Sequence, residues 1–288
     1  MNKLPRCRRL LALLMLGGSL LALLPAQAAD KLSAEQAEAL VVESGLANQL
    51  PAIAPSVATG LTTNPGFARN LGEEELQIVL KAFSRAYAPT RLAADISAGL
   101  PGQLKPAAAA EALTWLRSDL GRKITALEEA ASKAATDDAA MEQAQELYQR
   151  LSPRRGERYE RLVKASEVSE SSAQLLIDTA IGTAYGVAST AGKPTPPDLD
   201  EIRREYERNR EAMVDNLHGQ FMVLFASAYQ SLAEAELDQY IAFLESPSGR
   251  AYSKAMAAAI SRAMIKAARD AGKQIGDAIR VGKGQSGA

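Results

Sequence analysis

Apolar and polar residues follow a helical period along most of the chain, and the clearest example is residues 231–256, SLAEAELDQYIAFLESPSGRAYSKAM. Leu237, Ile241 and Leu244 fall on one face, and acidic and small residues fill most of the positions between them. Spacings of three and four residues between apolar positions are typical of an amphipathic helix with one buried side. The segment therefore predicts a helix that packs against a core through these three residues.

A tight corner is predicted to join this helix to a second one. Ser231 and Glu234 have the spacing of a capping box, in which a hydroxyl and a carboxylate bind free N–H groups at a helix start. Ser246 is expected to cap the second helix, and Pro247 follows at the first helical position, where its missing N–H costs nothing. Gly249 then lies in the first turn. Because glycine is a poor helix former, its place there predicts close contact with a neighbouring helix.

The rest of the chain also favours helices. Alanine, leucine, glutamate, lysine and arginine dominate, and long alternating runs of β-branched residues are absent. Helix starts are expected at Ser33, where Gln36 completes a capping box, and at Ser118 and Ser152. The predicted fold class is therefore all-α, a multi-helix bundle.

Three longer segments have distinct expectations. Residues 175–191 are the most apolar part of the chain after its N-terminal region and predict a buried central helix, in which Gly182 and Gly186 would let a second helix come close. Residues 198–229 predict one long helix. Residues 282–288, GKGQSGA, predict a disordered tail.

The corner motif Ser-x-x-Gly-Arg occurs twice, at positions 128 residues apart. The apolar residues before the motif match as well, whereas the similar segment that begins at Ser152 has its glycine one residue too late. The aligned pairs are Leu113 with Ile241, Trp115 with Phe243, Leu116 with Leu244, Ser118 with Ser246, Gly121 with Gly249, and Arg122 with Arg250. Together with Pro247, the last three pairs form corners to which we assign a structural role.

A second match supports a duplication. Residues 38–44 align with residues 160–166 at a separation of 122, and the difference from 128 fits within inter-helix loops. The predicted organisation is two similar helical halves packed together, a first repeat over 29–151 and a second over 152–281. Chance similarity between alanine-rich helices is the alternative explanation.

The second half resembles the domain of unknown function 2059 family of bacterial, mostly periplasmic proteins. Members of that family show an acidic helix start, an aromatic-rich helix and a Ser/Thr-Pro-x-Gly corner. The resemblance covers roughly residues 205–265, and the first half departs from it by having Asp119 and Leu120 after its serine. It implies a helical periplasmic domain but supplies neither an activity nor site residues. The matching segments are Glu234-Ala235-Glu236-Leu237, Tyr240-Ile241-Ala242-Phe243 and Ser246-Pro247-Ser248-Gly249-Arg250.

The first 28 residues have the pattern of a secretory signal peptide. Four basic residues precede an apolar run from Leu10 to Leu24, and Ala26-Gln27-Ala28 fits a small-x-small cleavage site. An uncleaved anchor is the alternative, although the run is shorter than the ~20 residues that a membrane span needs. Cleavage after Ala28 predicts a periplasmic protein without cysteine, because Cys7 is the sole cysteine.

The charge of the mature chain argues against nucleic-acid binding. The whole sequence has 33 basic and 34 acidic residues. Removing four basic residues with the signal leaves 29 basic residues against 34 acidic ones, a formal charge of −5. A mildly acidic chain lacks the electrostatic attraction that phosphate backbones require.

Candidate chemistry centres on His218, the sole histidine, which any Ser-His-Asp arrangement would have to use. It lies in a predicted helix beside Gly219, and we interpret it as a hydrogen-bonded structural residue. Asp215 shares its helix face, but two ligands are too few to indicate a metal site. No phosphate-binding loop or dinucleotide fingerprint is present. The sequence therefore predicts no catalytic residue, no metal and no cofactor.

A basic cluster leaves one membrane hypothesis open. Its members could contact anionic headgroups, although a solvated helix face is the more common role of such charges. The favoured hypothesis is a non-enzymatic periplasmic protein that binds an envelope component or another protein. The alternatives are a membrane-peripheral or lipid-binding protein, which would use this cluster and residues 175–191, and a hydrolase, which would use His218. The basic cluster consists of Arg154, Arg155, Arg158, Arg161 and Lys164.

Overall fold

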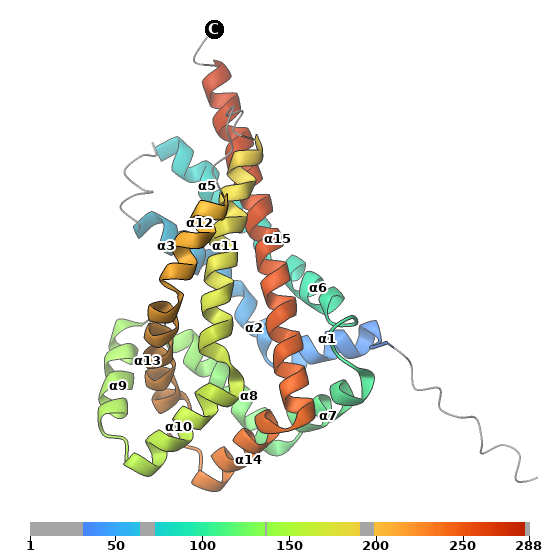
Figure 1. Ribbon diagram of the computed structural model, residues 1–288, viewed down its shortest axis with the longest axis vertical. Helices are drawn as coiled ribbons and strands as arrows, with labels where there is room; N and C mark the ends of the chain where they lie inside the picture. The colour runs from blue at the N-terminus through green and yellow to red at the C-terminus, as the bar shows by residue number, and fades with distance from the viewer. Residues whose placement is uncertain (1–30, 64–72, 136, 191–198, 286–288) are drawn as a thin grey trace, which may run out of the picture. The chain divides into compact units, whose positions relative to one another are not determined.

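Wherever the structure of the chain is described, its regular secondary structure is helical. The computed structural model describes residues 31–63, 73–135, 137–190 and 199–285. These residues contain helices and no strands, which confirms the all-α prediction (Figure 1). The helices of the first part are α1 (Ala34–Glu43), α2 (Leu46–Gln49), the 3-10 helix η1 (Leu50–Ala52), α3 (Ile53–Thr63), α5 (Glu73–Ala86), α6 (Pro89–Gly99), α7 (Pro106–Leu116) and α8 (Asp119–Ala134).

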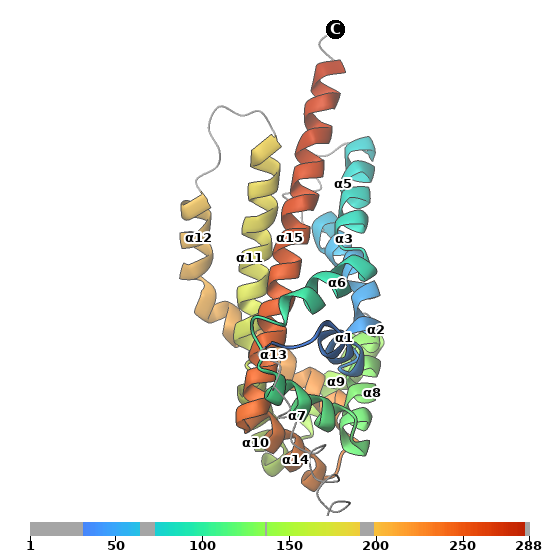
Figure 2. The same cartoon turned by 90° about the vertical axis from the view of Figure 1, so that its right-hand side faces the viewer.

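The second part continues with longer helices. Two of them, α11 and α15, run alongside each other in both views (Figures 1 and 2). No helix in the described ranges is long and apolar enough to cross a membrane. The helices are α9 (Asp138–Gln149), α10 (Pro153–Ser166), α11 (Val168–Thr190), α12 (Leu199–Arg208), α13 (Arg210–Ala228), α14 (Glu234–Glu245) and α15 (Pro247–Gln285).

Two glycines explain why α11 and α15 approach so closely. A Cβ atom added at Gly186 would lie 2.8 Å from the backbone nitrogen of Lys273 and 2.9 Å from the Cα atom of Gly272. A Cβ atom at Gly182 would lie 3.3 Å from the Cβ atom of Ala268. The backbones can meet at this distance only because the side chain is absent at Gly186. The expected close helix contact is confirmed, and it lies within the folded protein.

The buried side chains form two clusters, and the helix that follows each corner joins the cluster of the other half. One cluster contains residues of α1, α5, α6 and α7 together with α15 residues from Ala255 to Ile275. The other contains residues of α10, α13 and α14 together with Ile124 of α8. A boundary near residue 151 therefore does not separate the two clusters, because α8 lies before it and α15 after it, and each packs with the cluster of the other half.

Several helix starts follow local sequence and one does not. Ser33 and Gln36 form the predicted capping box, with the Ser33 hydroxyl accepting from the Gln36 N–H at 3.1 Å. The predicted box at Ser231 is wrong. Leu232 is buried in the turn before α14, and Ala233 is the N-cap of that helix. The Ala233 N–H donates to the Glu236 carboxylate at 2.8 Å.

Two predicted segments differ from the structure. The expected long helix over 198–229 is divided into α12 and α13 at Asn209, whose side-chain amide donates to the Glu205 carbonyl at 3.2 Å and competes with the backbone ladder. Helix α15 reaches Gln285 and so covers residues 282–285 of the expected disordered tail. Extending an existing helix gains one hydrogen bond for each residue that is fixed, which favours this continuation. The signal segment 1–28 and the last three residues lie outside the described residues.

Candidate functional site

The two corners have the same capping geometry. Ser118 accepts a hydrogen bond from the Gly121 N–H at 3.0 Å, and Ser246 accepts one from the Gly249 N–H at 2.9 Å. Both serines are therefore N-caps, as the sequence predicts. In each corner an arginine four residues after the serine donates to the carbonyl just before that serine. These pairs are Arg122 with Arg117 and Arg250 with Glu245.

The corner glycines lie against the last turn of the preceding helix. A Cβ atom at Gly121 would overlap the Trp115 carbonyl oxygen and lie 3.0 Å from the Leu116 Cα atom. At Gly249 it would overlap the Phe243 carbonyl oxygen, six residues earlier as in the first corner. Backbone atoms cannot move aside as a flexible side chain can. Gly156, by contrast, would meet nothing within 4 Å, which agrees with its place outside the motif.

Aromatic side chains connect the corners to each other. The rings of Trp115 and Phe243 stack with centroids 4.7 Å apart and an angle of 8° between their planes. Trp115 also stacks with Tyr240 at 6.2 Å. Parallel aromatic pairs at such distances contribute more than their buried area alone. Two residues that align in the sequence thus contact each other in the fold.

The segments aligned at the separation of 122 also agree in backbone conformation. Ser44 donates its hydroxyl to the Val41 carbonyl at 3.2 Å, and Ser166 donates to Val163 at 3.0 Å. The next residue in each case has a positive φ, 72° at residue 45 and 51° at residue 167. Among the described residues these are the two positions with positive φ.

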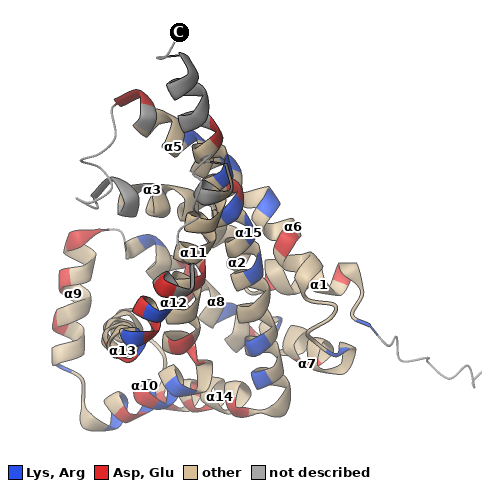
Figure 3. Ribbon diagram, turned by 45° about the horizontal axis from the view of Figure 1, so that its top comes forward, with Lys and Arg blue, Asp and Glu red and all other residues tan. Residues whose placement is uncertain are grey.

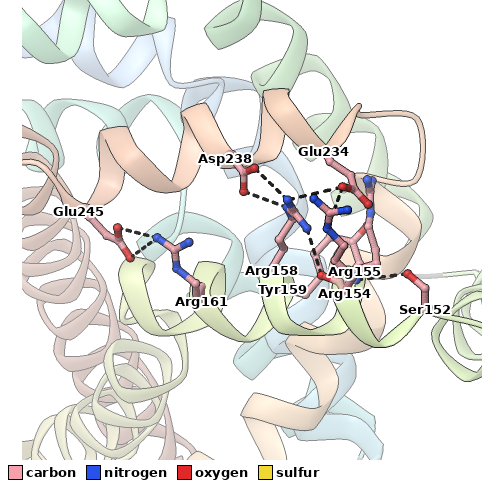
Figure 4. Close-up of polar contacts among 9 residues, drawn as sticks. All are labelled: Ser152, Arg154, Arg155, Arg158, Tyr159, Arg161, Glu234, Asp238 and Glu245. Carbon is pink, nitrogen blue, oxygen red and sulfur yellow. Dashed lines mark hydrogen bonds and ion pairs between the residues drawn. The ribbon is translucent and has the colours of Figure 1, made fainter.

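Three arginines of the predicted basic cluster lie against the acidic side chains of α14 (Figure 4). Nε of Arg154 lies 3.3 Å from a Glu234 oxygen, and Nε of Arg158 lies 2.9 Å from an Asp238 oxygen. The third ion pair, Arg161 with Glu245, has a separation of 2.9 Å. Acidic and basic residues accordingly occur together along α10 and α14 (Figure 3).

The electrostatics of the basic cluster reflect this pairing. The hydrogen bond from Arg158 lowers the pKa of the Asp238 carboxyl, and the same bond raises the pKa of Arg158. Arg155 is used differently, because it donates to the Tyr159 hydroxyl at 3.0 Å and to the Tyr229 carbonyl at 2.6 Å. Four arginines of the cluster therefore join α10 to the helices beside it.

His218 also makes an inter-helix contact. Its Nε2 atom lies 2.9 Å from a Glu160 oxygen, which joins α13 to α10. The described residues contain no group of three or more side chains suited to holding a metal ion. The histidine thus contacts a carboxylate of a neighbouring helix.

Sequence reasoning missed Glu128 of α8. One of its carboxylate oxygens accepts from the Tyr229 hydroxyl at 2.6 Å and from the Tyr240 hydroxyl at 2.8 Å. Burial raises the pKa of this carboxyl, against the opposing effect of the two hydrogen bonds. The available signal was its position, since it follows Ile124 by four residues on the buried side of α8.

Comparison with known proteins gives one family and no individual relative. No curated protein and no solved structure matches the chain. The family match begins within α13, includes α14 and the second corner, and ends in α15. Residues 220–277 match the model of the family described as uncharacterized protein conserved in bacteria (DUF2059), which confirms the resemblance in the second half.

Proposed function

We propose that this chain is a non-enzymatic interaction protein of the bacterial cell envelope. Its export would depend on the signal segment 1–28, and its partner would be a protein or another envelope component. The family description supports a bacterial origin and leaves the role open.

The observation that carries this proposal is how the ionisable side chains are used. The residues that sequence analysis considered for chemistry or membrane binding instead connect helices: His218 contacts Glu160, and Arg158 and Arg161 contact acids of α14. Such contacts build a stable framework and contribute modestly to its free energy. A helical framework whose described residues show no catalytic constellation is suited to presenting a surface to a partner.

The same proposal includes an internal duplication. Its support is the matching geometry of the two corners and of the segments around Ser44 and Ser166. The exchange of α8 and α15 between the two buried clusters has the same reciprocal character. Two copies of one unit that exchange the helix after their corner would form a single body, and neither copy would complete its core alone.

Photo-crosslinking in intact cells tests the interaction. A photoreactive residue is placed at Gln143 of α9 and at Ala130 of α8, which are both exposed. Ala144 is the matched control, because it is adjacent to Gln143 and 2 % exposed. The expected result is a discrete crosslinked product at one of the exposed positions and none at Ala144, with mass spectrometry identifying the partner. The interaction proposal is wrong if the exposed positions give the same products as the buried control.

Fractionation tests the location independently. N-terminal sequencing of protein from a periplasmic extract should give a mature chain that starts at Ala29. Recovery of a membrane-bound chain that retains residues 1–28 would contradict the proposed export.

A further inference from the structure

A small cavity lies where the two corners meet. Its volume is about 60 Å³, several times the roughly 10–15 Å³ that one water molecule requires. Aromatic side chains from both corners line it, together with the Glu128 carboxylate and the Ser44 and Thr125 side chains. The aromatic side chains are Trp115, Tyr240, Phe243 and Tyr252, each partly buried.

Glu128 accepts from two described hydrogen-bond donors, and neither is charged. Both tyrosine hydroxyls donate to the same oxygen, Oε1. The described groups that shift the pKa of this carboxyl are the two tyrosine hydroxyls, beside burial, and they include no lysine or arginine. Carboxylates removed from water are usually paired with a cation, because desolvation of the charge is costly. The cavity therefore combines a carboxylate whose described donors are uncharged with several aromatic side chains.

The aligned position in the other half shows that the fold does not require this carboxylate. Position 256, which is 128 residues after Glu128, is Met256, and its side chain is 7 % exposed within the first buried cluster. The residues aligned with Tyr229 and Tyr240 are Pro101 and Ala112. An apolar residue thus suffices on the helix after the second corner, whereas the carboxylate follows the first corner and its two tyrosine partners precede the second.

We propose that this cavity binds a small organic ammonium ion, with the positive nitrogen at Glu128 and its methyl groups against Trp115 and Tyr240. Aromatic faces attract cations through their quadrupole, and this attraction is strongest in sites shielded from water. The carboxylate adds a charge-assisted hydrogen bond or ion pair. The cavity volume restricts the ligand to an ammonium group with a few carbon atoms. This ligand site goes beyond the proposed interaction role and does not depend on it.

Fluorescence provides a direct measurement, because Trp115 is the sole tryptophan of the chain and lines the cavity. The purified mature chain is titrated with methylammonium and tetramethylammonium chloride. Potassium chloride at matched ionic strength controls for salt, and tert-butanol controls for apolar size without charge. The expected result is a saturable change with an organic ammonium ion and none with either control. Equal responses to methylammonium and potassium would overturn the proposal.

Two substitutions assign the response to the cavity. Glu128→Gln keeps the size of the side chain and removes its charge, so binding should weaken about tenfold or more. Glu129→Gln is the matched control. The Glu129 carboxylate accepts from Asn48 at 2.9 Å and does not line the cavity, so its replacement should leave binding unchanged. Equal binding by wild type and folded Glu128→Gln would exclude the site.

A second variant covers the case in which Glu128→Gln does not fold. Thr125→Met fills the cavity from α8 and leaves the Glu128 hydrogen bonds in place. It should abolish the response to the ammonium ion, with folding checked by circular dichroism. An unchanged titration in this variant would place the binding elsewhere and refute the proposed cavity site.

Discussion

The two corners share a local geometry but lead into helices of different length and surroundings. Helix α8 extends for 16 residues after the first corner, whereas α15 extends for 39 residues after the second. The first carries Glu128 among tyrosines, and the second has Met256 at the aligned position within an apolar cluster. A short sequence motif is therefore sufficient to form the corner, while distant residues determine what the following helix does.

The largest expected effect concerns the corner glycines. Gly249→Ala and Gly121→Ala should each destabilise the protein by about 2–3 kcal/mol, because the new Cβ atom would overlap a backbone carbonyl of the preceding helix. Gly156→Ala is the matched control and should stabilise by about 0.5–1 kcal/mol, since that helical glycine has no neighbour within 4 Å. Denaturant unfolding of the three variants measures the difference in sign. The same sign for all three would show that the corner contacts are unimportant.

The next prediction concerns the glycine contacts between α11 and α15. Gly186→Ala should destabilise by about 2 kcal/mol, because its Cβ atom would press on the backbone of α15 near Lys273. Gly182→Ala should reduce stability less, because its new Cβ atom would lie 3.3 Å from its nearest neighbours, one of which is the Ala268 methyl group. Thermal unfolding of both variants tests this order. The reverse order would mean that α11 and α15 separate more easily than their contacts indicate.

What the sequence could predict follows from how local each contact is. The caps at Ser118 and Ser246 involve residues three positions apart, so the motif is visible in the chain. The partners of Glu128 lie 101 and 112 positions away, and nothing near Glu128 in the sequence indicates them.

The basic cluster shows the same limit. The positive charges on α10 are evident in the sequence, but Asp238, which pairs with Arg158, lies 80 positions later. Only the fold brings these two charges together in an inter-helix contact. That α15 joins the buried cluster of α1 and α7 could not be anticipated for the same reason, because these helices lie far apart in the sequence.

A smaller effect tests whether the two corners are equivalent. Ser118→Ala and Ser246→Ala should each destabilise by about 1 kcal/mol, because each removes the acceptor for the N–H of a glycine. Ser231→Ala is the control, since Ser231 is exposed and Ala233 caps α14. Its unfolding midpoint should match that of the wild type. A large loss of stability in Ser231→Ala would mean that Ser231, and not Ala233, caps α14.

The smallest effect is a pH dependence that has opposite signs for two carboxyls. The folded-state pKa of Asp238 is lowered by its bond from Arg158, so its contribution to stability is present above its ordinary value of 3.8 and is lost as the pH falls through the folded value. Glu128 has a pKa raised above 4.5 by burial, so its contribution is present below 4.5 and is lost as the pH rises through the raised value.

Unfolding of wild type, Asp238→Asn and Glu128→Gln is compared between pH 3 and pH 7. The advantage of wild type over Asp238→Asn should shrink towards acid and with added salt, because this pair is exposed and screened. The difference between wild type and Glu128→Gln should move the opposite way, towards lower relative stability of the wild type at neutral pH. Parallel pH profiles for both variants would mean that the two carboxyls have similar surroundings, and would remove the distinction between the ion pair that joins α10 to α14 and the buried carboxylate on α8.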